Sequence, residues 1–160
     1  VVSSRSRIRV TGDNGAGKTT LLVALAAHAA PDVLYVPQVL DARARTAIAE
    51  ELSASSRDER GRWLSLFASL GADPSPILST PCPSPGEARK LAIAKGLARE
   101  VSGLILDEPT NDLDLPSIER LERALAAYEG ALVFASHDES FARATETERW
   151  LLGGGALMVA

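Results

Sequence analysis

Short apolar runs alternate with longer amphipathic segments along the chain, and this alternation predicts an α/β fold. Four of the runs have the length and composition of buried strands. They are Arg7–Thr11, Val33–Val36, Gly103–Leu106 and Ala131–Ala135. Because strands that alternate with helices usually pair in parallel, we expect a mainly parallel sheet flanked by helices.

The segments between these strands have helical periodicity and recognisable ends. We expect single helices over Lys18–Ala29, Ser84–Glu100 and Pro116–Tyr128, and two helices within residues 41–71. Five prolines predict a loop over Asp73–Pro85. Near the end of the chain, Arg149–Val159 is predicted to form a β-hairpin that turns at Gly153-Gly154-Gly155.

The chain has 160 residues, a formal net charge of −4 and a single cysteine. This length suffices for one domain with its own core, so residues 1–160 are expected to form a single domain. Without a basic block, direct binding of nucleic acid is disfavoured. Cys82 alone allows no disulfide framework, which agrees with a cytoplasmic location. Because the chain starts at Val1 and has no long apolar run, we expect a fragment without a signal peptide or membrane segment.

A glycine-rich stretch after the first predicted strand matches the phosphate-loop pattern G-x-x-x-x-G-K-[ST]. It reads Gly12-Asp13-Asn14-Gly15-Ala16-Gly17-Lys18-Thr19, followed by Thr20. The motif requires a strand before it and a helix after it, and both are predicted here. Backbone N–H groups and the helix N-terminus would then bind phosphate oxygens. We expect Lys18 to reach the outer phosphates and the Thr19 hydroxyl to ligate Mg²⁺.

Two acidic residues end the third predicted strand, where open α/β sheets bind their ligands. We expect Asp107 to hold Mg²⁺ through water, and Glu108 to orient or deprotonate an attacking water. An exposed acidic pair without a function is the plainer alternative, and the phosphate loop disfavours it. After the fourth strand, His137 is either structural or a sensor of the γ-phosphate, and Asp138 could cap the next helix.

Five stretches in this order resemble the motifs of an ATP-binding cassette (ABC) ATPase domain. They are GDNGAGKTT, YVPQ, SPGEARKLAIAKGLA, GLILDEPTNDLD and ASHD, and they extend over nearly the whole chain. The resemblance implies an α/β fold of the P-loop NTPase type, in which residues 41–82 form a small helical subdomain. It also implies the cofactors ATP and Mg²⁺ and an ATPase activity.

The same resemblance assigns roles to residues outside the phosphate loop. Gln38 would contact both Mg²⁺ and the attacking water, which makes it the third catalytic residue. Asp114 would lie in the loop that links two sites across a pair of cassettes. The signature motif would press on the γ-phosphate bound by an opposing cassette, so that full activity needs a second cassette. Its residues here would be Ser84, Gly86 and Glu87.

The run EPTNDLDLPSIERLE, followed by SHDESF, is most similar to ABC-F proteins, soluble tandem-cassette ATPases that act on ribosomes. The chain resembles their second, C-terminal cassette and would be a fragment of a larger protein. A second cassette and the ribosome would be its partners, in translation or in antibiotic resistance. The alternatives are the ATPase subunit of an ABC membrane transporter and a nucleotide-binding module with little turnover. A chromosome-maintenance ATPase would need long coiled coils, for which residues 41–82 are too short.

Four features depart from the family pattern. Only eleven residues precede Gly12, where the family has further strands and an aromatic residue that stacks on adenine, so the N-terminal β region is truncated. The stretch from Lys18 to Gln38 lacks the usual β insertion. Asp112 stands where the family has histidine. The signature reads Pro83-Ser84-Pro85-Gly86-Glu87, which predicts a capping box at the start of a helix and a weakened but usable signature.

Overall fold

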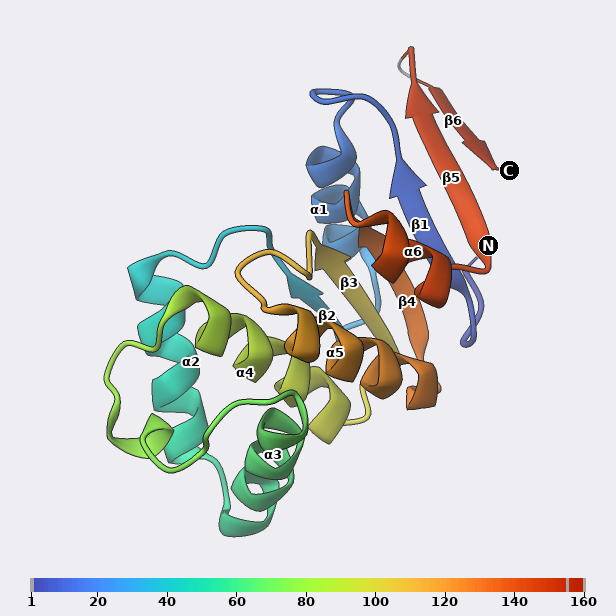
Figure 1. Ribbon diagram of the computed structural model, residues 1–160. Helices are drawn as coiled ribbons and strands as arrows, with labels where there is room; N and C mark the ends of the chain where they lie inside the picture. The colour runs from blue at the N-terminus through green and yellow to red at the C-terminus, as the bar shows by residue number, and fades with distance from the viewer. Residues whose placement is uncertain (1, 155, 160) are drawn as a thin grey trace. The chain divides into compact units, whose positions relative to one another are not determined.

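The computed structural model describes residues 2–154 and 156–159, and these fold into two compact units (Figure 1). The first unit consists of Val1–Gln38, Val101–Thr110 and Leu125–Ala160, and the second of Val39–Glu100 and Asn111–Ala124. Residues 41–82, which we expect to form a helical subdomain, lie within the second unit. None of the helices in the described part of the chain is long and apolar enough to cross a bilayer.

A mainly parallel sheet of six described strands forms the centre of the first unit, in the order β2-β3-β4-β1-β5-β6. β5 pairs in parallel with β1, whereas β6 is antiparallel to β5. All strands predicted from the sequence are confirmed, including the terminal hairpin, although Gly155 of its predicted turn lies outside the described residues. The strands are β1 (Arg7–Thr11), β2 (Val33–Val36), β3 (Gly103–Asp107), β4 (Ala131–Ala135), β5 (Glu148–Gly153) and β6 (Ala156–Val159).

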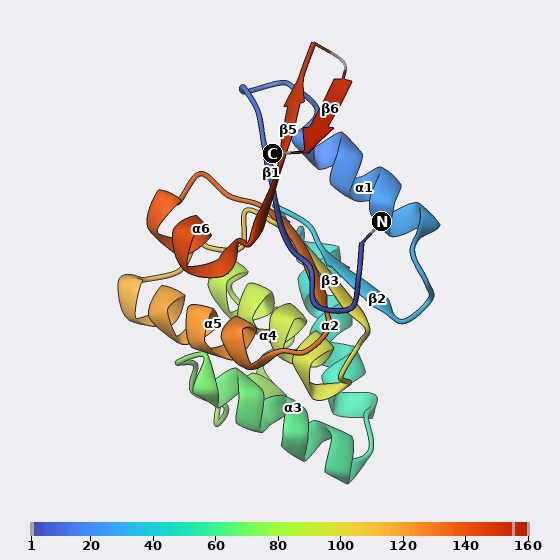
Figure 2. The same cartoon turned by 90° about the vertical axis from the view of Figure 1, so that its right-hand side faces the viewer.

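Two helices of the first unit, α1 (Lys18–His28) and α6 (Glu139–Thr145), cover opposite faces of this sheet (Figure 2). The side chains of a strand alternate between its faces. Ile8 and Val10 of β1 therefore share a core with Leu22 of α1. On the other face, Phe134 of β4 meets Phe141 of α6 in a T-shaped contact, with 5.5 Å between ring centroids.

Helices make up most of the second unit (Figure 1). They are α2 (Ala42–Ala54), α3 (Arg57–Ser69), α4 (Pro85–Ala98) and most of α5 (Leu115–Ala127). The loop predicted over Asp73–Pro85 contains a short 3₁₀ turn at Ile77–Ser79 that the sequence interpretation missed. Its cause is the apolar side chain of Ile77, which is 1% exposed and fixes the loop to the core.

Polar side chains fix where the helices of the second unit begin. Asp41 and Ser56 each accept a hydrogen bond from the backbone N–H three residues later, which satisfies a donor that the first helical turn leaves open. The capping box predicted for Ser84 and Glu87 is confirmed, with Pro85 in the first helical turn. Pro85 costs no backbone hydrogen bond there, because that N–H has no partner within the helix.

We expect the substitution Trp63→Ala to lower the free energy of unfolding by about 3–5 kcal/mol. The indole of Trp63 is 1% exposed, and its Nε1 donates a hydrogen bond to the Leu91 carbonyl at 2.7 Å. Urea denaturation measures the loss. Leu78→Ala is the control, because Leu78 is 47% exposed and its loss should change stability by less than about 0.5 kcal/mol. Equal effects of the two substitutions would contradict the assignment of Trp63 to the core.

Candidate functional site

The residues expected to bind and hydrolyse nucleotide in the first unit follow the carboxyl ends of neighbouring parallel strands. β1 leads into the phosphate loop, and β2 ends two residues before Gln38. Asp107 ends β3 directly opposite Ala135 of β4, and His137 follows β4 by two residues. Because parallel strands end at a common edge, the fold brings these groups together at the edge formed by the carboxyl ends of the strands, where open α/β sheets bind ligands.

The first glycine of the phosphate loop lies where no side chain fits. Gly12 has a φ of 150°, and a Cβ atom there would lie 2.3 Å from the carbonyl oxygen of Leu152. Any larger residue would therefore push the loop away from β5. The loop continues through four further residues, after which Gly17 leads into α1. They are Asp13, Asn14, Gly15 and Ala16.

Lys18 at the start of α1 closes the phosphate loop. Its Nζ donates hydrogen bonds to the carbonyl oxygens of Gly12 at 2.8 Å and Asp13 at 3.1 Å. Gly17 is the N-cap of the helix and provides no side-chain cap, so the first backbone N–H groups of α1 are open to an anion. Thr19 and Thr20 follow on exposed positions of the first turn.

Asp107 places a carboxylate at the end of the buried strand β3. Asp107 as a whole is only 2% exposed. Burial raises the pKa of Tyr35 on the neighbouring strand β2, and the negative charge of Asp107 raises it further. The Thr19 hydroxyl and the Asp107 carboxylate are oxygen donors, the type that Mg²⁺ prefers, so these two residues fit such an ion.

Glu108 has a strained backbone at the edge of the sheet. Its φ of 49° lies in the left-handed region, which costs a residue with a side chain roughly 1–2 kcal/mol. One hydrogen bond of the Glu108 backbone and one of its carboxylate maintain this conformation. The backbone N–H donates to the Ala135 carbonyl at 2.9 Å, and the carboxylate accepts from the His137 backbone N–H at 3.1 Å. Strain of this kind is concentrated at functional sites.

His137 lies beside Glu108 but remains largely open to solvent. Its Nε2 is 3.3 Å from the Glu108 carboxylate, and its side chain is 65% exposed, against 7% for that of Glu108. The imidazole can therefore reach a bound ligand while it contacts the buried carboxylate. Gln38 is exposed just after β2. Asp138 caps α6 as predicted, by accepting from the N–H groups of Ser140 and Phe141.

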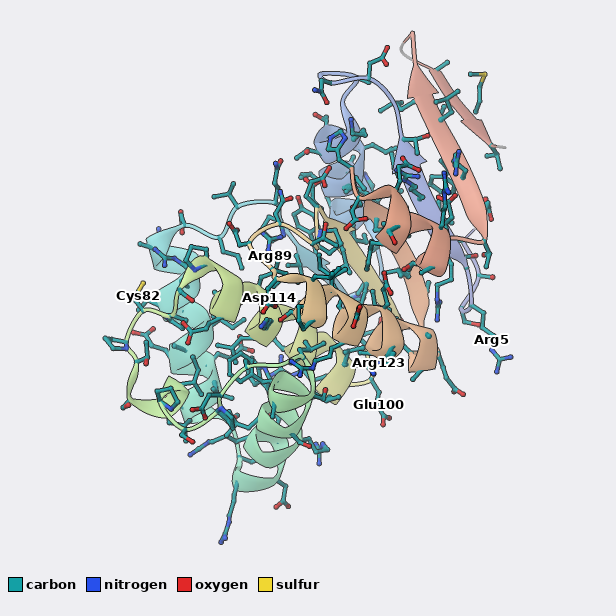
Figure 3. All side chains as sticks on the ribbon, in the orientation of Figure 1. Arg5, Cys82, Arg89, Glu100, Asp114 and Arg123 are labelled. Atoms are coloured by element: carbon teal, nitrogen blue, oxygen red, sulfur yellow. The ribbon has the colours of Figure 1, made fainter. Side chains whose placement is uncertain are left out.

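The expected signature residues lie in the second unit, at the start of α4. Ser84 and Glu87 bond to each other through the capping box, and Arg45 of α2 donates to the Pro83 carbonyl at 2.7 Å. The two prolines therefore belong to an ordered helix start that a second helix supports. Cys82, just before them, is an exposed free thiol (Figure 3).

Gly86 contacts the loop that contains Asp112. A Cβ atom on Gly86 would lie 2.8 Å from the Asp112 carbonyl oxygen. Asp112 itself has a left-handed φ of 62°, and its carboxylate lies 3.6 Å from the guanidinium of Arg89, a side chain that is 2% exposed. Asp112, where the family has histidine, thus forms an ion pair within its own unit.

Asp114 caps the start of α5, where its carboxylate accepts from the Ser117 backbone N–H at 3.1 Å. This interaction with Ser117 holds the pKa of Asp114 below its usual range, and the positive charge of Lys90 lowers it further. Asp114 therefore remains negatively charged at neutral pH. Figure 3 shows Asp114 and Arg89 among the side chains of the second unit.

Three arginines that support these sites were missed by the sequence interpretation. Arg45 holds the Pro83 carbonyl, and Arg89 pairs with Asp112. The third is Arg9, which donates to the Ser136 carbonyl, next to His137. Arg9 carries a signal that could have been used, because a charged residue in the middle of a buried strand is rare without a partner.

Solved structures show the same fold. The ATP-binding subunit of an ABC transporter matches with a TM-score of 0.76 at 20% identity, over 99% of this chain and 80% of that one. A dimeric ATP-binding cassette in a post-hydrolysis state, bound to ADP and phosphate, matches with a TM-score of 0.75 at 18% identity, over 99% and 87% of the two chains. At these identities the similarity establishes the fold alone.

No protein-family model matches the chain. Curated protein sequences, however, are similar to it over most of its length. The identity is 35% over 160 residues with the ATP-binding protein Uup of Caulobacter vibrioides. It is 33% over 159 residues with the erythromycin resistance ATP-binding protein MsrA of Staphylococcus epidermidis, and 31% over 166 residues with the ribosome protection protein VmlR of Bacillus subtilis.

These alignments cover 92%, 94% and 94% of this chain, but only 26%, 32% and 30% of the relatives. The chain therefore spans about a quarter to a third of the length of the curated relatives it matches. The ordered motifs and these curated relatives together identify the chain as an ABC-type ATP-binding cassette. The chain belongs to this superfamily, and its curated relatives are ABC-F proteins.

Two glycine substitutions in the second unit should have opposite effects on stability. Gly86→Ala would place a Cβ atom 2.8 Å from the Asp112 carbonyl, so we expect a loss of about 1–3 kcal/mol. Gly61 lies inside α3, and a Cβ atom there would have no neighbour within 4 Å, so Gly61→Ala should gain about 0.5–1 kcal/mol. Urea denaturation of both variants tests this, and a stabilised Gly86→Ala would contradict the close contact.

Proposed function

We propose that this cassette binds Mg-ATP and hydrolyses it to ADP and phosphate, in the cytoplasm and together with a second cassette. The observation that carries the proposal is the position of Glu108. Its carboxylate is buried, lies beside the exposed His137, and is held at the edge of the sheet to which the phosphate loop also belongs. A carboxylate with these neighbours is suited to act on a water molecule that attacks a bound phosphate.

The phosphate loop binds the triphosphate. The N–H groups of Gly12–Thr19 and the N-terminus of α1 supply the donors, and Lys18 neutralises charge on the outer phosphates. Thr20 continues the first turn of α1 and adds a further hydroxyl. Thr19, Asp107 and Gln38 would hold Mg²⁺, which when bound neutralises charge on the phosphate oxygens.

Glu108 is the general base in this proposal. It accepts a proton from the attacking water as the water oxygen bonds to the γ-phosphorus and the bond to the ADP oxygen breaks. A positioned base of this kind contributes about 10²–10⁴-fold to the rate. His137 contacts the γ-phosphate and also the Glu108 carboxylate, so the bound phosphate and the base are in contact with the same residue. Gln38 orients the attacking water.

The second unit serves the site of an opposing cassette. Ser84, Gly86 and Glu87 at the start of α4 present an anion-binding helix terminus to the γ-phosphate held by the partner. Asp114 contributes its negative charge to the contact that links the two sites. Each site is therefore complete only in a pair, and we expect the isolated chain to hydrolyse ATP slowly.

The ribosome is the proposed target of the longer protein. The relatives include a ribosome protection protein, the erythromycin resistance protein MsrA and the tylosin resistance ATP-binding protein TlrC of Streptomyces fradiae. By this proposal the chain is the second cassette of an ABC-F protein, and ATP joins the two cassettes until hydrolysis separates them. The contacts with the ribosome would be made outside this chain.

We expect the Glu108→Gln substitution, together with the matching change in the second cassette, to trap the intact protein on ribosomes in Mg-ATP. The amide of glutamine still accepts from the His137 N–H, so the site keeps its shape, but it cannot take a proton. ATP turnover should fall by about 10²–10⁴-fold. Sedimentation with Mg-ATP then shows whether the protein travels with ribosomes.

Lys18→Ala is the matched control, because it should prevent nucleotide binding and leave the protein off the ribosome. Sedimentation of the Glu108→Gln protein with membranes would instead support a transporter subunit. Unchanged ATP turnover in that variant would contradict the assignment of Glu108 as the base. Tight ATP binding without measurable turnover in the unmodified protein would support a nucleotide-binding module.

A further inference from the structure

A charged residue occupies the middle of a buried strand in the first unit. Arg9 lies in β1 between Ile8 and Val10, which face the core under α1. By alternation its side chain points to the opposite face, toward α6. That side chain is only 4% exposed. An arginine in such a place remains charged, so its position depends on the groups that bind the guanidinium.

The guanidinium binds residues on both sides of His137. Nη2 donates to the Ser136 carbonyl at 3.0 Å, on the strand side of the histidine. Nη1 donates to one oxygen of the Glu139 carboxylate at 3.1 Å, and Nη2 donates to the other. Such two-fold pairing between arginine and a carboxylate fixes direction as well as distance. Glu146 of the following segment lies 3.7 Å from Nη1.

The pair is asymmetric, because Arg9 is buried while the Glu139 side chain is 61% exposed. The Arg9 guanidinium holds the pKa of Glu139 below its usual range through their hydrogen bonds. Glu139 in turn raises the pKa of Arg9. Both groups are therefore charged at neutral pH. Removal of Glu139 alone would leave a buried guanidinium without its main partner, which is costly.

The same arginine borders a cavity of about 450 Å³ in the first unit. Its lining includes Gly12 and Lys18 of the phosphate loop as well as His137 and Glu139. The ion pair thus lies next to the groups that are proposed to bind phosphate. It is also linked to Glu108, because His137 contacts that carboxylate through both its backbone N–H and its ring.

We propose that Arg9 and Glu139 form a clamp that positions His137 against Glu108. This proposal rests on the function proposed above for these two residues, and it makes Arg9 and Glu139 positioning residues rather than catalytic ones. Without the clamp, the loop of residues 136–139 is held only by the Glu108 carboxylate and the Asp138 cap, and the imidazole loses its fixed place beside the carboxylate. Hydrolysis should slow, while the phosphate loop continues to bind nucleotide.

The test compares the single variant Glu139→Ala with the double variant Arg9→Met/Glu139→Ala. Glu139→Ala removes the main carboxylate partner of the buried guanidinium and leaves it only the more distant Glu146, so both the melting temperature and kcat should fall. The double variant no longer has a buried guanidinium without its main partner, and Glu146 keeps its ion pair with Arg149, so the melting temperature of the double variant should rise above that of Glu139→Ala. Its kcat should stay about 10- to 100-fold low, with the KM for ATP within about twofold, because the loop is still not held. Ser140→Ala, an exposed neighbour on α6, is the control and should change neither quantity.

A second measurement requires no ATPase activity. The chain has two histidines, so the proton NMR spectrum resolves the His137 ring with His28 as an internal reference. We expect the His137 signal to shift in both Glu139→Ala and the double variant, and to stay in place in Ser140→Ala. His28 on α1 should not respond in any of them.

The outcomes distinguish a failure of the clamp proposal from a failure of the proposed ATPase function. Recovery of kcat together with the melting temperature, or an unmoved His137 signal in both variants, would show that the ion pair only stabilises the fold and would overturn the clamp. A shifted His137 signal in this chain, together with no ATP hydrolysis by the intact unmodified protein with its second cassette, would support the clamp and overturn the proposed ATPase function.

Discussion

The structure depends on the parallel register of the central strands β3, β4 and β1. Asp107 pairs with Ala135, and Phe134 with Arg9, so the three strands end at nearly the same level. A shift of one residue would turn every side chain of a strand to the other face of the sheet and remove the core against α1. The hydrophobic burial that fixes this register therefore also sets the positions of the phosphate loop, the acidic pair and the histidine loop. Strand pairing places the loops of the site at one edge of the sheet, and contacts between side chains then orient the individual groups.

Buried charged groups fix the side chains of the site within that arrangement. The carboxylate of Glu108 holds the His137 loop from one side, and Arg9 holds it from the other through Ser136 and Glu139. The left-handed backbone of Glu108 shows that stability was not the only constraint at this position. In the second unit, the signature helix start follows the same principle, because a capping box and the Arg45 guanidinium order a segment that two prolines interrupt.

The sequence predicted the strands to within one residue and the helices for which it gave ranges to within about two, since apolar runs and caps are local signals; for α6 it indicated only the cap at Asp138. The phosphate loop and the acidic pair could be located because their spacing is fixed by chemistry. Three features could not be derived in this way. The contact of Gly86 with Asp112, the support of Pro83 by Arg45 and the pairing of Arg9 with Glu139 join residues that are 26, 38 and 130 positions apart. Only tertiary structure brings such residues together, and the 3₁₀ turn at Ile77 likewise depends on burial by distant segments.

The most direct test of the account is hydrogen–deuterium exchange of this chain with and without saturating Mg-ATP. If nucleotide binds at the carboxyl edge of the sheet, exchange should slow in residues 12–20, around Glu108 and in residues 136–138, and the Lys18→Ala variant should show no such change. Protection limited to the second unit, or none in these loops at saturating nucleotide, would contradict the assignment of this edge as the ATP site.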